Sequence, residues 1–305
     1  MNLIYLAESE NFPDESIKRL ETKAQVVTDL SGIDKSNVTV AFVRLSKYIG
    51  PEFHLEFPSL KYVVSPTTGV NHIDMRYFSE HGIRVITLRG HYAFLDNIHA
   101  TAEHTLAIVL ALFRQVPQAY NSVSNGQWNR YPFKGRELHG KSVLVLGYGR
   151  VGSQVAFLYE SFGCKVSAHD LHDSKIPLKY KCDFSDALSQ CDLLSIHVDL
   201  SDSNYGLVSE SIINAMKESA VVVNTSRGEL IDQKALLNAL MDKRIAAAAI
   251  DVLHDEPEPI NEMVRESIKV CGPRLLITPH ISGFTEESLP KVENFVTSLL
   301  LEELD

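Results

Sequence analysis

Cysteine is scarce in this chain, and its spacing matches neither a metal site nor a disulfide framework. The four cysteines are Cys164, Cys182, Cys191 and Cys271. We expect them to be reduced, packed thiols in a cytoplasmic protein that holds no metal. Long apolar runs are missing too, since the longest fall well short of the ~18 residues that a membrane helix needs. The N-terminal stretch "MNLIYLAESENFPDES" carries no signal-peptide pattern, so we expect no membrane partner.

Basic residues are outnumbered: 29 Lys and Arg face 39 Asp and Glu, for a net charge of -10. This balance argues against sequence-independent binding of nucleic acid, which needs clustered positive charge. The negative net charge is still compatible with a small anionic substrate, because a few arginines placed at the binding site outweigh a distant acidic surface. The hydrophobic fraction of 45% and the length of 305 residues are typical of a globular protein with about two domains.

The first hundred residues alternate short apolar runs with helical segments. Helical spacing is found at 14–21 and 71–82. The expected buried strands cover 2–7, 25–30, 38–43, 60–66 and 83–88. Alternation of strand and helix predicts a parallel sheet with helices on its faces.

A long helix is expected next, at 99–120, and it is apolar over most of its circumference. Such a helix must be buried between domains or subunits. A second series of strands and helices then begins at 141–170, and we expect the last twenty or so residues to form an amphipathic helix that packs back onto the first domain. The further strands of this series are expected at 193–198, 220–226, 246–253 and 275–280.

The stretch "GYGRVG" places Gly147, Gly149 and Gly152 in a G-x-G-x-x-G pattern between a strand and a helix. In that setting the glycines allow a tight turn, the approach of a pyrophosphate, and close packing of helix on strand. The exposed N–H groups at the start of the helix would hold the phosphates. Asp170, eighteen residues beyond Gly152, ends the next strand and can bind a ribose 2′-hydroxyl. No arginine follows it closely, so the sequence predicts NAD rather than NADP as the cofactor.

Three polar residues stand at the ends of later predicted strands. A fourth polar residue lies in the loop after one of these strands. They are Arg227, Asp251, Glu256 and His280. Ligands of a doubly wound sheet bind outside the carboxyl ends of its strands, so all four should face one crevice.

These four residue types suit the transfer of a hydride to a carbonyl. A planar arginine can hold the carboxylate of a 2-oxo acid through two parallel hydrogen bonds. Histidine is the acid whose ordinary pKa suits protonation of the carbonyl oxygen, and Glu256 would fix its tautomer and raise its pKa. Asp251 would hold the nicotinamide carboxamide.

Each residue also has a structural interpretation when taken alone. Arg227 could pair with Glu229 at the surface, Asp251 could cap a turn or helix, and Glu256 could be a solvated loop carboxylate. A single His280 would be read as a buried strand-end histidine. The combination after a dinucleotide turn favours the chemical interpretation.

The residues together resemble the D-isomer-specific 2-hydroxyacid dehydrogenases, from about Val38 to Ser288. The blocks that carry the resemblance are "GVNHID", "ATAEHTLAIVLAL", "GQWNR", "LHGKSVLVLGYGRVG", "VVVNTSRGELID", "AAIDVLHDEPEP" and "TPHISG". The resemblance implies an α/β protein of two doubly wound parallel-sheet domains that forms a homodimer around the long helix. A Rossmann NAD-binding domain, 99–284, would be inserted into a flavodoxin-like substrate domain, 1–98 completed by 285–305.

The resemblance also matches Arg227, Glu256 and His280 to the family's catalytic trio, and Asp251 to a cofactor contact. The full set expected at the cofactor is Gly147, Gly149, Arg150, Val151, Gly152, Asp170, His197, Thr225, Ser226, Asp251, His280, Ser282 and Gly283. The set expected at the substrate is Arg44, Thr67, Thr68, Gly69, Arg227 and His280.

Departures from the family pattern bear on the substrate. In "VSPTTGVNHID" the loop Thr67–Gly69 falls where backbone N–H groups hold the substrate carboxylate, and Ser65 stands where phosphoglycerate enzymes often have arginine. Ser65 therefore argues against a phosphorylated substrate, although other basic residues could supply the charge: Arg44, Lys47, Arg89 or His91. The segment 87–104 is longer than usual, and we expect it to influence specificity.

We therefore expect an NAD-dependent enzyme that interconverts a 2-oxo acid and its D-2-hydroxy acid. One alternative is a 3-phosphoglycerate dehydrogenase proper. Another, from a different class, is an NAD-sensing binding protein that resembles the C-terminal-binding-protein corepressors, which keep the same trio. The sequence carries no long flanking tail or docking segment of that kind, which favours the enzyme.

Overall fold

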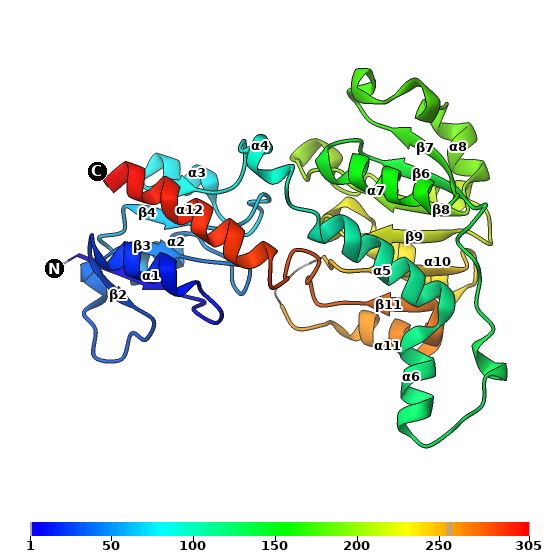
Figure 1. The fold of residues 1–305 in the computed structure, drawn as a ribbon, viewed down its shortest axis with the longest axis horizontal. Helices are drawn as coiled ribbons and strands as arrows, with labels where there is room; N and C mark the ends of the chain where they lie inside the picture. Colours follow the sequence, from blue (N-terminus) through cyan, green and yellow to red (C-terminus); the bar gives the residue numbers. More distant parts are fainter. Residues whose placement is uncertain (1, 255, 257, 305) are drawn as a thin grey trace. The chain divides into compact units, whose positions relative to one another are not determined.

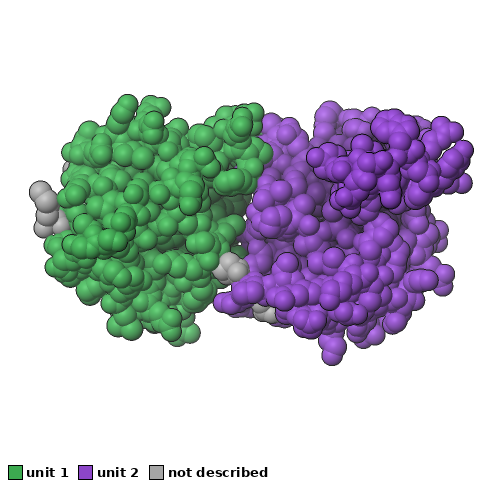
Figure 2. All heavy atoms as spheres, turned by 90° about the horizontal axis from the view of Figure 1, so that it is seen from below, with its two compact units in different colours: residues 1–97, 284–305 green, residues 98–283 purple. Residues whose placement is uncertain are grey.

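The computed structural model describes residues 2–254, 256 and 258–304, and the chain forms two compact units. Unit 1 comprises residues 1–97 and 284–305, and unit 2 comprises residues 98–283 (Figure 2). Asp255 and Pro257, which belong to the "HDEPEP" block, lie outside the described residues.

Unit 1 is built on a five-stranded parallel sheet with the order β2-β1-β3-β4-β5, which is the flavodoxin-like order. Three of these strands, β2, β3 and β4, are labelled in Figure 1. The strands are β1 (Leu3–Leu6), β2 (Gln25–Val27), β3 (Val38–Phe42), β4 (Tyr62–Val64) and β5 (Arg84–Ile86). All five lie within the predicted strands. The centre of the sheet is β3, whose five residues are all buried, as expected of an apolar run without alternation.

The helices of unit 1 are α1 (Asp14–Glu21), α2 (Pro51–Glu56), α3 (Met75–Glu80), α4 (Tyr92–Leu95) and α12 (Ser288–Leu304). The C-terminal helix α12 packs against α1 and against β4 and β5, so the prediction that it returns to the first domain is confirmed. The lengthened segment predicted to influence specificity contains α4. Phe94 of α4 stacks on Phe295 of α12, with ring centroids 3.9 Å apart.

Unit 2 is built on a six-stranded parallel sheet with the order β11-β10-β9-β8-β6-β7. The strands are β6 (Ser142–Leu146), β7 (Lys165–His169), β8 (Leu193–Ile196), β9 (Val221–Asn224), β10 (Ala247–Ile250) and β11 (Leu275–Ile277). Lys181 forms an isolated parallel bridge with Ala168, which extends the sheet beyond β7 by one residue. The direction of winding reverses between β6 and β8, where such folds bind dinucleotides. The predicted doubly wound fold class is confirmed.

The helices of unit 2 are α5 (Ala100–Arg114), α6 (Val116–Ser124), α7 (Arg150–Ser161), α8 (Phe184–Gln190), α9 (Glu210–Ala215), α10 (Gln233–Met241) and α11 (Glu262–Cys271). The prediction of one continuous helix over 99–120 is wrong. Gln115 adopts a left-handed conformation with φ 52°, and a new helix begins beyond it with Pro117 in its first turn. Proline lacks the N–H that a continuous helix would require and disfavours a helical residue before it.

Helix α5 is buried by contacts inside unit 2, against α7 and against β9, β10 and β11. By contrast, none of the residues of α6 is buried. In the described part of the chain, every helix is too short or too polar to cross a bilayer.

Candidate active site

The glycine turn between β6 and α7 is shaped by close backbone contacts. Gly147 has φ 90°, and a Cβ added to it would lie 2.4 Å from the carbonyl oxygen of His197. A Cβ on Gly152 would lie 1.9 Å from the carbonyl oxygen of Gly147. At Gly149, however, no atom of the described chain lies within 4 Å of the added Cβ. Two glycines therefore serve packing, and the third faces open space.

That open space lies at the start of α7, where the N–H groups of Arg150, Val151 and Gly152 stand in the first turn. Such groups have no partner within the helix, and the helix dipole favours an anion there. The Arg150 side chain turns back, because its Nη1 donates to Ile98 O at 2.9 Å. The turn therefore fits a pyrophosphate bound by backbone N–H groups.

Asp170 directly follows β7 and is partly exposed. Its Oδ2 accepts a hydrogen bond from Tyr148 N at 2.7 Å, and its Oδ1 accepts from His172 N at 2.8 Å. These bonds fix the carboxylate beside the glycine turn. A carboxylate has about four acceptor positions, so both oxygens can still accept from a ribose hydroxyl.

His197 follows β8 and is buried with its backbone against Gly147. Its Nε2 lies 2.7 Å from Ser195 Oγ, and burial lowers the pKa of the imidazole to about 3, so the ring is neutral. Its buried Nδ1 has no hydrogen-bond partner among residues 2–254, 256 and 258–304. An orphaned polar atom next to the dinucleotide turn fits a bound cofactor that completes it.

The turn after β9 is held by Asn224, whose Oδ1 accepts from Ser226 N at 3.0 Å and whose Nδ2 donates to Arg227 O at 2.8 Å. Thr225 is buried and shares a hydrogen bond of 2.7 Å with Thr105 of α5. Burial lowers the pKa of Arg227, and the nearby Glu256 is the strongest of the carboxylates that oppose this shift.

The loops that carry Arg227 and Glu256 touch through their backbones. A Cβ on Gly228 would lie 2.0 Å from the carbonyl carbon of Leu253 and 2.3 Å from the backbone nitrogen of His254. Only glycine allows this approach. The contact fixes the separation of the two loops.

Glu256 and His280 form a hydrogen-bonded pair. His280 Nδ1 lies 2.6 Å from Glu256 Oε2, and Glu256 Oε1 accepts from Leu253 N at 2.7 Å. An ionised carboxylate only accepts, so Nδ1 carries the proton of this bond and Glu256 leaves Nε2 for other contacts. His280 itself has a left-handed backbone, with φ 53°.

Asp251 lies behind that pair and is buried. Its Oδ1 accepts from Thr278 Oγ1 at 2.6 Å and from Ile281 N at 3.0 Å, and its Oδ2 accepts from Ser282 N at 2.8 Å. Burial alone would raise the pKa of Asp251, but these bonds and one from His104 outweigh it, so the pKa is lowered. The carboxylate is ionised and fixes the loop that carries His280.

In unit 1, the loop after β4 carries the other predicted contacts. Thr67 Oγ1 donates to Gly69 O at 2.9 Å and lies 3.0 Å from Ser65 Oγ, while Thr68 is partly exposed beside them. Ser65 is fully buried. The Ser65 hydroxyl therefore shapes the loop.

Arg44, which the sequence predicts to be a substrate contact, is bonded within unit 1. Its Nε donates to Glu293 Oε1 at 2.8 Å, its Nη1 donates to Glu10 O at 2.9 Å, and Nη2 also binds Glu293. Each of the three guanidinium nitrogens thus donates to a partner in unit 1. The sequence could not reveal this because Glu293 is 249 positions away.

The structure thus brings Arg227, Glu256, His280 and Asp251 to the carboxyl ends of β9, β10 and β11 in unit 2. Ser282 and Gly283 continue the same loop as His280. Sequence reasoning missed His104 and Thr278, which flank Asp251. The sequence offered only one indication of their importance, namely that His104 lies in the block "ATAEHT" and Thr278 in the block "ITPH".

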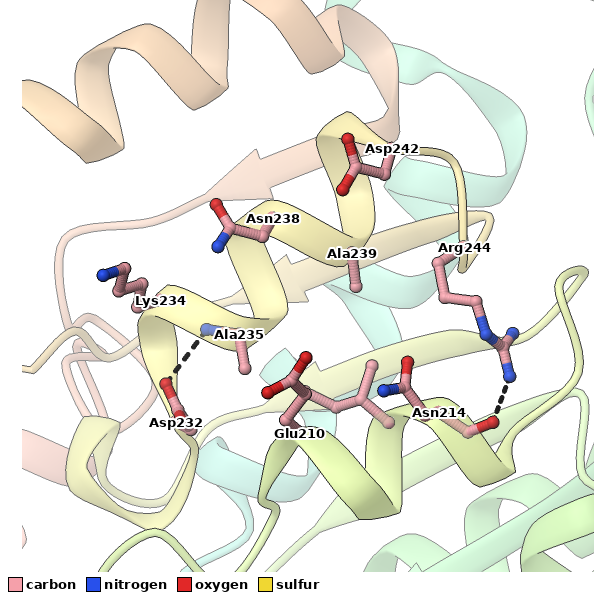
Figure 3. Close-up of a pocket in the computed structure, with 10 residues that line it drawn as sticks. Glu210, Asn214, Asp232, Lys234, Ala235, Asn238, Ala239, Asp242 and Arg244 are labelled. Atoms are coloured by element: carbon pink, nitrogen blue, oxygen red, sulfur yellow. Dashed lines mark hydrogen bonds between the residues drawn. The ribbon is translucent and has the colours of Figure 1, made fainter.

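A cavity of about 490 Å³ lies between α9 and α10 (Figure 3). Two of its polar side chains serve helix ends: Asp232 accepts from Ala235 N at 2.9 Å, and Arg244 donates to Met216 O at 2.7 Å. None of the predicted site residues lines this cavity.

Comparison with known proteins agrees with this geometry. The family described as D-isomer specific 2-hydroxyacid dehydrogenase, NAD binding domain, matches residues 106–282. The glyoxylate reductase of Thermofilum pendens is 32% identical over 253 residues, which cover 80% of this chain and 72% of that protein. The D-3-phosphoglycerate dehydrogenase of Bacillus subtilis is 32% identical over 265 residues, 85% of this chain and 48% of that protein.

A solved structure described as the pyruvate reductase of Chlamydomonas reinhardtii has a TM-score of 0.85 at 24% identity and covers 100% of this chain and 96% of its own. At this level of identity the similarity shows that the two proteins share a fold. The chain spans about half the length of the phosphoglycerate dehydrogenases that it matches.

A doubly wound unit with a dinucleotide turn and a histidine–carboxylate pair defines a dehydrogenase-type fold with an NAD-binding domain. The chain belongs to the D-isomer-specific 2-hydroxyacid dehydrogenase family.

Proposed function

We propose that this protein is an NAD-dependent oxidoreductase that interconverts a 2-oxo acid and its D-2-hydroxy acid. The observation that carries the proposal is the pair of His280 and Glu256, 2.6 Å apart, on loops of the same sheet edge that presents Arg227. Unit 2 would be the Rossmann cofactor domain and unit 1 the substrate domain.

When bound, NAD supplies or accepts the hydride at the substrate carbon. In the reducing direction His280 holds a proton at Nε2 and transfers it to the carbonyl oxygen as that oxygen gains charge. Glu256 keeps Nδ1 protonated and stabilises the imidazolium, because it is a carboxylate in direct contact. Arg227 holds the substrate carboxylate with two parallel N–H donors.

The cofactor would be held mainly by the glycine turn and by strand ends. The N–H groups of Arg150, Val151 and Gly152 would bind the pyrophosphate, with Gly147 and Gly149 permitting its approach, and Asp170 would bind the ribose. The remaining contacts would come from His197, Thr225, Ser226, Ser282 and Gly283. We revise the role of Asp251 from a carboxamide contact to the support of the His280 loop, because its carboxylate already accepts four donors.

The substrate is proposed to be unphosphorylated. The loop Thr67–Gly69 would receive the substrate carboxylate with its backbone N–H groups. Ser65, where an arginine would serve a phosphate, is fully buried and bonded to Thr67. Arg44, one of the basic residues that could supply charge in its place, is bound to Glu293.

A panel of 2-oxo acids with NADH, followed by loss of NADH absorbance, tests the activity. It should include glyoxylate, pyruvate, hydroxypyruvate and 3-phosphohydroxypyruvate. We expect turnover of an unphosphorylated acid. Strong preference for the phosphorylated acid would favour the phosphoglycerate enzyme, and NAD binding without any turnover would favour the sensor.

The roles within the trio are tested by His280→Ala, which should lower kcat by about 10²–10⁴-fold while NADH binding is retained. Arg227→Lys is the matched control for Arg227→Ala, since lysine keeps the charge but loses the two-pronged geometry. A His280→Ala protein with the wild-type rate would refute the assignment.

We propose a homodimer, located in the cytoplasm, that is formed through α6 and the segment after it. The large apolar side chains there are strongly exposed in a single chain: Trp128 is 93% exposed, Tyr131 81% and Tyr120 75%. Large apolar side chains that are exposed close together in the sequence mark a candidate contact with a partner. Sedimentation should give a dimer for the wild type and a smaller species for Trp128→Asp, and a monomeric wild type would contradict the proposal.

A further inference from the structure

We propose that His104 and Thr278 are positioning residues that act on His280 through the carboxylate of Asp251. The inference rests on the proposed dehydrogenase function, because it assigns a purpose to the orientation of His280. It extends the site from the sheet edge into the body of unit 2, to helix α5.

The contacts between these groups define which atom donates. Thr278 Oγ1 donates its only hydrogen to Asp251 Oδ1 at 2.6 Å. His104 Nε2 lies 3.2 Å from Thr278 Oγ1 and 3.3 Å from Asp251 Oδ1. Both of these oxygens act as acceptors toward His104, so its Nε2 must carry a hydrogen.

Asp251, whose carboxylate they bind, forms several hydrogen bonds with the loop that carries His280. Asp251 O accepts from His280 N at 2.8 Å, and the carboxylate of Asp251 accepts from Ile281 N and Ser282 N. His280 is a non-glycine residue at φ 53°, a conformation that needs support from its surroundings. Asp251 supplies that support from both sides of the residue.

The backbone conformation at His280 sets the direction of its imidazole ring. Because His280 adopts this conformation, its Nδ1 meets Glu256 Oε2 and its Nε2 remains for the substrate. A carboxylate that loses a donor in a buried place will move toward other donors or toward water. Loss of His104 or of the Thr278 hydroxyl should therefore loosen the turn and misdirect His280.

Four variants make matched pairs. Thr278→Val removes the hydroxyl at nearly constant shape, and Thr278→Ser keeps it. His104→Leu removes the donor, and His104→Gln places an amide N–H near the position of Nε2. We expect kcat to fall about tenfold in Thr278→Val and His104→Leu, with recovery in the Ser and Gln variants. The Kd for NADH should change less than kcat does, because Ser282 and Gly283 supply only part of the proposed cofactor contacts.

Two readouts separate positioning from general damage. In a His280→Ala background, Thr278→Val should cause no further loss of kcat, because the residue through which it acts is gone. Hydrogen exchange at the amides of Ile281 and Ser282 should accelerate about tenfold in Thr278→Val, whether or not the protein is active.

Unchanged exchange together with unchanged kcat in both Thr278→Val and His104→Leu would overturn the inference. A full additional loss of kcat in the His280→Ala background would overturn it as well. An inactive wild type with accelerated exchange in the variants would instead overturn the proposed function and leave the support of the loop by His104 and Thr278 established.

Discussion

Alanine at Gly149 and alanine at Gly152 should affect different properties, the NADH affinity and the thermal stability, although the two glycines belong to one motif. At Gly152 the added Cβ would lie 1.9 Å from Gly147 O, a backbone atom that cannot rotate away. At Gly149 the Cβ would meet no described atom within 4 Å, and the backbone there, φ -78° and ψ -158°, is open to alanine. The two variants therefore separate packing from cofactor binding.

The magnitudes follow from these contacts. Overpacking costs about 1–3 kcal/mol, and the better helix propensity of alanine returns up to about 1 kcal/mol at Gly152. Because the clash at 1.9 Å is with a backbone atom, we expect an overpacking cost of about 2–3 kcal/mol. The net loss of about 1–3 kcal/mol lowers Tm by roughly 2–12 °C for a domain of this size. Gly149→Ala should keep Tm or raise it slightly, because alanine restricts the unfolded chain. Its Cβ would stand in the path of the pyrophosphate, and a tenfold loss of affinity corresponds to about 1.4 kcal/mol.

The assay combines thermal unfolding without cofactor and titration with NADH followed by fluorescence. We expect Gly152→Ala to unfold at lower temperature, and Gly149→Ala to unfold like the wild type but bind NADH at least tenfold more weakly. Each variant is the control for the other. Wild-type NADH affinity in Gly149→Ala, or wild-type Tm in Gly152→Ala, would refute the reasoning.

Three further predictions concern other parts of the molecule. Gly228→Ala should force apart the backbones at Leu253 and lower both Tm and kcat; a stable, fully active variant contradicts this. Asp170→Ala should reduce the preference for NADH over NADPH, measured as the ratio of kcat/KM values, and a wild type that already prefers NADPH would remove this role. Burial raises the pKa of Glu293 to about 7 despite its bond to Arg44. The folded state then holds a proton that the unfolded state releases above about pH 4.5, so stability should fall as pH rises from 4.5 to 7. Urea unfolding should show this slope in the wild type and a flatter one in Glu293→Gln.

The strands were predictable because each is a short apolar run between turn residues, and this pattern is local. The dinucleotide turn was predictable for the same reason, since Gly147, Gly149 and Gly152 stand within six residues between a strand and a helix. The break at Gln115 was missed. A single left-handed glutamine has no strong sequence signal, and Pro117 was the only warning.

The sequence by itself determined the family, the two βα series and the residues at the strand ends, because parallel strands carry their ligands at one edge. Only the tertiary structure decided how those residues are held. His104 meets Thr278 across 174 positions, and Arg44 meets Glu293 across 249, so neither pair follows from local pattern. The side chains of Asp251 and Arg44 were expected to contact ligands, and the structure adds the protein groups that they bind. The carboxylate of Asp251 accepts from the loop of His280, and the guanidinium of Arg44 donates to the buried Glu293 of unit 1.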